Sequence, residues 1–143
     1  MHGTALEDKS MRITHRGGKK FAAETRGHEI VGDLPPDQNG EDTGMTPPEW
    51  FLASLGACVG VYVVNYCQMK GLPYEGMSVG IDWEKHMDPP RIGRIRCDIH
   101  MPEGFPTHMR DAALKVARQC LIHNTLHQKP HIEIDYAKAA GPG

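Results

Sequence analysis

The longest uncharged stretch of the chain predicts a helix that runs from about Thr46 to Lys70. Thr46 is a suitable N-cap, two prolines follow it in the first turn, and Gly71 suits the end of the helix. Small and apolar residues also occupy the remaining faces, so we expect this helix to be covered on every side. The apolar side chains that recur at helical spacing are Phe51, Leu52, Leu55, Val59, Tyr62, Val63 and Tyr66.

A membrane span is the competing interpretation of this stretch. No other part of the chain has a comparable apolar run, and small or polar residues interrupt this one. We therefore favour a buried central helix in a globular protein. The interrupting residues are Ser54, Gly56, Gly60, Asn65 and Gln68.

Alternation of apolar and polar residues predicts strands on both sides of this helix. Gly17-Gly18 suits the turn of an N-terminal hairpin, and residues 33–45, rich in Pro, Gly and acidic residues, predict an exposed loop. The predicted strands cover residues 11–16, 19–26, 28–31, 77–84, 94–101 and 131–135.

A second helix is expected after the proline-rich break at residues 102–106. Thr107 would cap it, Cys120 would lie on its apolar side, and Asn124-Thr125 would interrupt it. The order of strands, helix, strands, helix and strand predicts an α+β fold built on antiparallel sheet. Because so few strands cannot surround an apolar helix, we also expect a second subunit to complete its burial.

The length of 143 residues suggests one domain, expected over residues 11–136 between a flexible lead-in (1–10) and a flexible tail (137–143). A formal net charge of −2 provides no bulk attraction to nucleic acid or to an anionic membrane, so neither partner is expected. The N-terminal residues lack the apolar core of a signal peptide, which favours a cytoplasmic location. The four cysteines form no CxxC motif, and a disulfide scaffold is not expected.

The cysteines differ in their surroundings. Cys58 lies mid-helix among Gly56, Ala57 and Gly60, which leave room for another element or a ligand. Cys67 lies on the opposite face of the same helix, and Cys97 lies between isoleucines on a strand, so both are interpreted as packing residues. Sequence spacing alone does not bring Cys58 and Cys120 together.

Two segments resemble the OsmC/Ohr superfamily, the osmotically inducible and organic hydroperoxide resistance proteins. Gly44-Met45-Thr46-Pro47-Pro48-Glu49 and Leu52-Ala53-Ser54-Leu55-Gly56-Ala57-Cys58 resemble its G-x-x-P-x-E/Q-L-L-x-A-x-x-A-C signature. Ala117-Arg118-Gln119-Cys120 is similar to its later A-x-x-C segment. The chain resembles a less characterised branch of the superfamily, with A-L-G-A/G-C spacing, more than it resembles the established peroxidases.

The resemblance implies antiparallel sheets around a central helix in an intertwined homodimer, with active sites at the subunit interface. It implies a thiol peroxidase in which Cys58 attacks an organic hydroperoxide and Cys120 resolves the sulfenic acid as a disulfide. A dithiol reductant would then reset the pair, and no cofactor is expected. In the family an arginine oriented by a glutamate activates the first thiol. Here Arg26, or else Arg16, and Glu49 are the candidates, although Glu49 lies one residue after the best-matched family position.

Two other functions are compatible with the sequence. One is a binding module without peroxidase activity, in which Trp50, Phe51 and Tyr62 line an apolar pocket for a small ligand. In a peroxidase, such a pocket would favour alkyl or aryl hydroperoxides over hydrogen peroxide. The other is a metal-binding protein, because Cys120, His123 and His127 are spaced to share one helix face and suit zinc.

Overall fold

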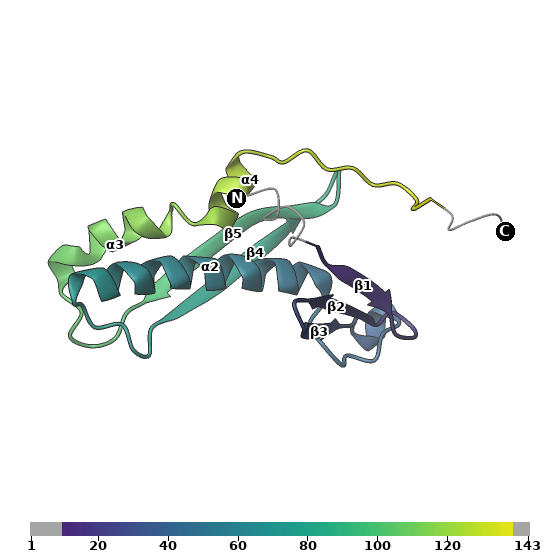
Figure 1. Ribbon diagram of the computed structural model, residues 1–143, viewed down its shortest axis with the longest axis horizontal. Helices are drawn as coiled ribbons and strands as arrows, with labels where there is room; N and C mark the ends of the chain where they lie inside the picture. Colours follow the sequence, from purple (N-terminus) through teal and green to yellow (C-terminus); the bar gives the residue numbers. More distant parts are fainter. Residues whose placement is uncertain (1–9, 139–143) are drawn as a thin grey trace. The chain divides into compact units, whose positions relative to one another are not determined.

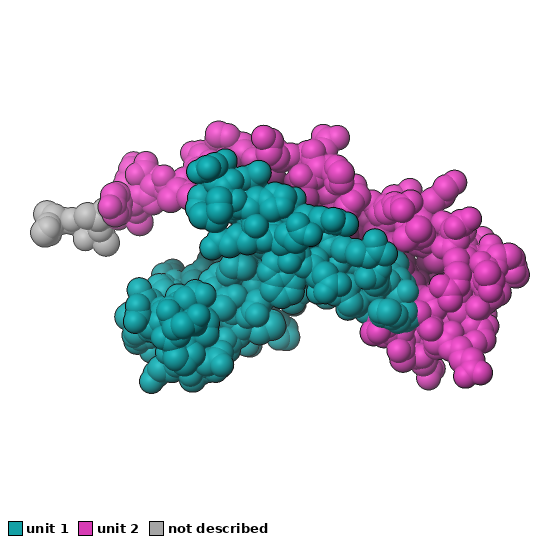
Figure 2. Space-filling model, turned by 180° about the vertical axis from the view of Figure 1, so that it is seen from behind, with its two compact units in different colours: residues 1–57, 79–100 teal, residues 58–78, 101–143 magenta. Residues whose placement is uncertain are grey.

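A computed structural model describes residues 10–138. Most of the expected lead-in and tail, residues 1–9 and 139–143, therefore lies outside the described residues. The chain forms two compact units (Figure 2). Among the described residues, the first contains 10–57 together with 79–100, and the second contains 58–78 and 101–138.

The N-terminal strands form a three-stranded antiparallel meander in the order β1 (Arg12–His15), β2 (Phe21–Thr25) and β3 (His28–Gly32) (Figure 1). Ile13 faces Ala23 across the first pair, and Ala22 faces Val31 across the second. The predicted hairpin and third strand are thus confirmed. Glycines with positive φ at positions 17 and 18 make the first turn, a conformation that side chains with a Cβ rarely adopt.

A second sheet of the first unit pairs β4 (Ser78–His86) with β5 (Arg91–His100), as the alternation predicted. The Ile81 side chain of β4 approaches Gly56 closely. A Cβ added at Gly56 would lie 2.7 Å from Ile81 Cδ1. Gly56, two residues before Cys58, therefore leaves room for the neighbouring strand β4. Room for another element or for a ligand was expected here.

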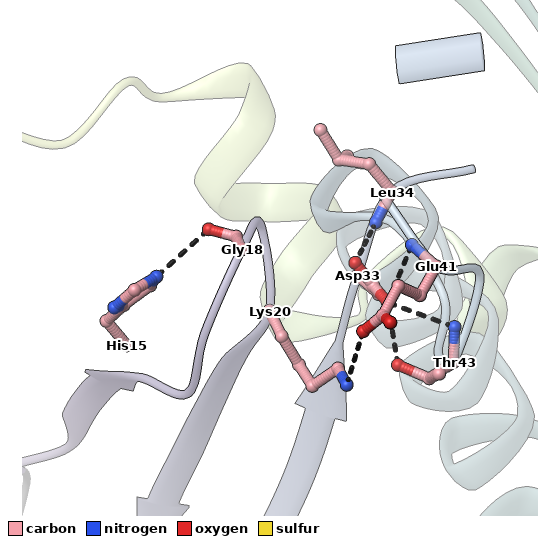
Figure 3. Close-up of polar contacts among 7 residues, drawn as sticks. All are labelled: His15, Gly18, Lys20, Asp33, Leu34, Glu41 and Thr43. Carbon is pink, nitrogen blue, oxygen red and sulfur yellow. Dashed lines mark hydrogen bonds and ion pairs between the residues drawn. The ribbon is translucent and has the colours of Figure 1, made fainter. Parts of the chain in front are cut away.

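The loop after β3 is organised by a buried carboxylate (Figure 3). Asp33 is only 1% exposed and accepts hydrogen bonds from Thr43 Oγ1 at 2.7 Å, Leu34 N at 2.8 Å, Thr43 N at 3.1 Å and Glu41 N at 3.3 Å. These donors, Thr43 Oγ1 above all, outweigh the opposing effect of burial and lower the pKa of Asp33 to about 2. The predicted exposed loop therefore has a fixed interior anchor that the sequence did not indicate.

The long helix α2 (Pro47–Lys70) has the predicted boundaries. Glu49 N donates to Thr46 Oγ1 at 3.3 Å and Thr46 N donates to Glu49 Oε1 at 2.8 Å, which is a capping box. Its buried stripe is Leu52, Leu55, Val59, Val63 and Cys67.

The opposite side of α2 is less covered than expected. Val61 is 56% exposed and Phe51 is 37% exposed, so a single copy of the chain does not enclose the helix. By length and composition alone α2 could cross a membrane, a test that the core helices of globular proteins also pass. Apolar surface on α2 is therefore exposed in the described chain.

The second helical region differs from the prediction. Thr107 does not cap it, because Thr107–Met109 is a short 3-10 helix after Pro106 and no side chain caps either element. The helix is also divided, into α3 (Arg110–Ala117) and α4 (Leu121–His127). Hydrogen bonds from Gln119 N to Val116 O and from Cys120 N to Ala117 O tighten the end of α3 into a 3-10 turn, after which Cys120 is extended.

The predicted interruption at Asn124-Thr125 is wrong. Both residues lie inside α4. The Thr125 hydroxyl donates a hydrogen bond to the Leu121 carbonyl at 2.9 Å, so this polar group has a partner within the helix. The predicted strand at residues 131–135 is also wrong for the single chain. That segment pairs with no strand among residues 10–138, and Ile132 and Ile134 are 71% and 94% exposed.

We expect Asp33→Asn to destabilise the fold at neutral pH, because it removes a charge-assisted acceptor from four hydrogen bonds. The folded pKa of about 2 lies below the ordinary value, so the contribution of Asp33 is complete above about pH 4 and is lost as pH falls through 2. Urea unfolding of both proteins from pH 6 to pH 2 should therefore show a difference in midpoint that narrows toward low pH. Asp37→Asn, an exposed change in the same loop, is the control, and a difference independent of pH would contradict this role.

Candidate functional site

The second unit brings two of the four cysteines together. Cys58 lies on α2 and is half-buried, whereas Cys120 precedes α4 and is completely buried. The Cys58 thiol lies near enough to Cys120 to raise the pKa of Cys120, and neither cysteine is in a disulfide. The proximity that the family resemblance implied, and that spacing could not provide, is therefore present in the chain.

Cys120 occupies an unusual position as the N-cap of α4. Its sulfur accepts a hydrogen bond from His123 N at 3.3 Å, as a serine or aspartate oxygen does at other helix starts. Burial raises the pKa of Cys120 and the neighbouring Cys58 raises it further, against the lowering effect of the His123 N–H. Cys120 is consequently a thiol that keeps its proton at neutral pH.

A groove of about 690 Å³ lies in the same unit. Tyr62, one helical turn after Cys58, contributes to one wall, and α4 with the residue after it contributes the rest. Of the three aromatic residues expected to line an apolar pocket, only Tyr62 does so, and most of the other lining side chains are polar. The lining residues are Tyr62, Leu121, Asn124, Thr125, His127 and Gln128.

The two other cysteines have the surroundings of packing residues. Cys67 is completely buried in the α2 stripe, and burial raises its pKa. Cys97 is half-buried on β5, where burial and then the charge of Asp98 raise its pKa. A raised pKa keeps both sulfurs protonated and poorly nucleophilic.

The candidate activating residues all belong to the first unit. Arg16 is committed to an ion pair with Glu29 at 2.8 Å, whereas Arg26 is exposed at the turn after β2, with φ of 52°. Glu49 forms the capping box of α2, a task that the sequence analysis did not assign to it. Their action on Cys58 stays a prediction.

The metal site expected from Cys120, His123 and His127 does not assemble as one cluster. Within residues 10–138 no group of three His, Cys, Asp or Glu side chains is placed to hold a metal ion. The Cys120 sulfur is directed to the backbone of His123 instead. The two histidines do meet, with 3.1 Å between their Nε2 atoms.

The family of the chain follows from a match to a family model. Residues 40–135, more than half of the chain, match the family model described as OsmC-like protein. The chain belongs to the OsmC-like family. This confirms the resemblance that the segments around Cys58 and Cys120 suggested. No match was found among the curated proteins.

Solved structures share the OsmC-like fold at low sequence identity. A protein of Psychrobacter arcticus has a TM-score of 0.75 and 17% identity over 80% of this chain and 85% of its own. A hypothetical protein of Aquifex aeolicus has a TM-score of 0.71 and 18% identity over 85% and 88% of the two chains. An organic hydroperoxide resistance protein of Legionella pneumophila has a TM-score of 0.63 and 19% identity over 82% and 88%. The α+β fold with antiparallel sheet is thereby confirmed.

Substitutions at Glu49 separate its capping role from any catalytic one. Glu49→Ala removes the acceptor of the Thr46 N–H and should destabilise the chain by about 1 kcal/mol. Glu49→Gln retains an amide oxygen at the same place, so it should cost less. The measurement is urea unfolding at neutral pH with exposed Glu75→Ala as control, and equal effects of the alanine and glutamine variants would argue against the capping box.

Proposed function

We propose that this OsmC-like chain is a two-cysteine peroxidase that reduces organic hydroperoxides. The observation that supports this function most directly is the pairing of a half-buried thiol, Cys58, with a completely buried one, Cys120, in a single unit. A disulfide between them requires the two sulfur atoms to come within about 2.05 Å of each other.

The reaction proceeds in two balanced steps. The Cys58 thiolate attacks the distal peroxide oxygen, the O–O bond breaks, and the alkoxide leaves and is protonated to the alcohol, so that Cys58 becomes a sulfenic acid. The Cys120 sulfur then forms a bond to the Cys58 sulfur, and the sulfenic hydroxyl leaves as water with the thiol proton. Two electrons have passed to the peroxide. A dithiol reductant restores both thiols through a mixed disulfide.

Burial supports the assignment of roles to the two cysteines. Cys58 is accessible enough for a peroxide to reach, whereas Cys120 is shielded from direct oxidation. Because the Cys120 thiol retains its proton, it can donate a hydrogen bond to an anionic Cys58 sulfur. The resolving thiol would thus support the attacking one before it reacts.

A thiolate at Cys58 also calls for a cation nearby, and we propose Arg26 for this task. Arg16 is the weaker candidate, since its charge already pairs with Glu29. Glu49 would orient the arginine only if its carboxylate can do so from within the capping box. Peroxide consumption by Glu49→Gln and by Glu49→Ala shows whether the charge of the Glu49 carboxylate is needed to orient the arginine.

The decisive test is a count of free thiols with peptide mapping before and after one equivalent of an organic hydroperoxide. We expect rapid loss of two thiols and a Cys58–Cys120 linkage. Cys58→Ser should reduce peroxide consumption by at least about a hundredfold, whereas Cys120→Ser should still undergo the first oxidation and stop at the sulfenic acid. Cys67→Ser is the matched control on the same helix. Unchanged turnover in Cys58→Ser, or oxidation scattered over all four cysteines, would contradict the mechanism.

We further propose that the peroxidase is a homodimer. Val61 and Phe51 leave apolar surface exposed on α2, and residues 131–135 carry a strand pattern without a partner strand in residues 10–138. An extended segment with two exposed isoleucines can gain both hydrogen bonds and burial by joining a free sheet edge. A second copy supplies such an edge together with a cover for α2.

The dimer proposal is tested by the double variant Ile132→Asp and Ile134→Asp. Burial of each isoleucine is worth about 1.5–3 kcal/mol, so its replacement by a charge should raise the dimer dissociation constant at least tenfold. Light scattering over a dilution series measures this constant. His131→Asp, on the alternate face of the segment, is the control. A wild-type chain that stays monomeric at all concentrations, or a double variant that dimerises as well as the wild type, would exclude this role.

A further inference from the structure

The strongest unassigned feature is the histidine pair on α4. His123 and His127 lie one helical turn apart, their ring centroids are 4.4 Å apart, and their Nε2 atoms are 3.1 Å apart. In this contact the N–H of one ring must donate a hydrogen bond to the unprotonated nitrogen of the other. Two imidazole nitrogens are therefore held next to each other by this hydrogen bond.

The rest of the His123 ring has no competing polar partner. Its Nδ1 atom is buried and forms no hydrogen bond within the described part of the chain. The contact with His127 is consequently the one hydrogen bond that the His123 ring forms there. Nothing in residues 10–138 draws its Nε2 atom away from that contact.

The spacing of the two nitrogens suits a shared metal ion. Two nitrogens bound at 2.0–2.1 Å to one tetrahedral Zn²⁺ lie about 3.3–3.4 Å apart, only a few tenths of an ångström more than in the pair. Binding would require each ring to turn its Nε2 lone pair away from the line between the two nitrogens and toward the ion, while α4 itself keeps its helical turn. Imidazole ligands suit Zn²⁺, Ni²⁺, Co²⁺ or Cu²⁺ rather than Mg²⁺ or Ca²⁺.

The surroundings define what kind of site this can be. His127 lines the groove, where Asn124 and Gln128 also contribute, so an ion at the pair can be reached from solvent. Because the described residues provide no third His, Cys or carboxylate, water would complete the coordination. Such a site binds an ion reversibly, unlike a closed structural site with four protein ligands.

We propose that His123 and His127 form a two-imidazole binding site for a divalent transition-metal ion on α4. The ion takes the place of the hydrogen between the two nitrogen atoms, which are 3.1 Å apart, and the ring that donated this hydrogen carries its proton on Nδ1 instead. The Cys120 sulfur is not a ligand, because it accepts the His123 N–H and is completely buried. This site does not depend on the proposed peroxidase activity.

The test is calorimetric titration of the reduced chain with Zn²⁺. One ion per chain should bind to this site, and His123→Gln and His127→Gln should each weaken that binding at least about tenfold. His131→Gln, an exposed histidine outside α4, is the matched control and should bind as the wild type does. Circular dichroism establishes that the variants remain folded. Equal affinity in the wild type and in both α4 variants, or no binding by the wild type, would overturn the proposal.

Cobalt provides a readout that separates imidazole from thiol ligands. The visible and near-ultraviolet absorption of bound Co²⁺ should lack the charge-transfer bands of thiolate coordination and should persist in the Cys58→Ser, Cys120→Ser double variant. Both results would support the histidine site. Strong thiolate bands that disappear in the double variant would place the ion on the cysteines and contradict it.

Discussion

The candidate site depends on a single contact at the start of α4, where the Cys120 sulfur takes the position of a helix-capping oxygen. The His123 N–H holds this sulfur at 3.3 Å, and complete burial keeps it protonated and next to Cys58. If α3 continued through residues 118–120, Cys120 would have helical backbone angles and its side chain would point in another direction. The break between the two helices is therefore what brings the second thiol to the first.

This break also marks the limit of what the sequence could predict. Helix α2 and strands β1 to β5 were predictable because caps, prolines and hydrophobic periodicity agree along those segments. At residues 117–119 the opposite holds, since alanine, arginine and glutamine favour helix and only tertiary contacts end it. Asn124-Thr125 predicted a break where the helix continues, because a threonine whose hydroxyl bonds to the preceding turn is tolerated in a helix.

The remaining differences between the predicted and the observed structure concern carboxylates that can serve more than one role. Glu49 matches the family glutamate in residue type, yet its carboxylate accepts the Thr46 N–H at the start of α2. Asp33 lies in a segment that composition marks as an exposed loop, yet it is buried because backbone donors converge on it. A carboxylate in a sequence is compatible with catalysis, capping or loop anchoring. The positions of its donors decide among these: Thr46, three residues away, for Glu49, and residues of the same loop for Asp33.

The short length of α4 connects its two proposed chemistries. A helix of seven residues is not stable by itself, so its position is set by the packing of Cys120 and by the groove walls it shares with Tyr62. A Cys58–Cys120 disulfide would replace that packing contact with a covalent bond between α2 and α4. The histidine pair lies within α4 and depends on the helical turn between positions 123 and 127 rather than on the distance between the helices. Oxidation of the thiols and binding of an ion can therefore use the same helix without requiring the same atoms.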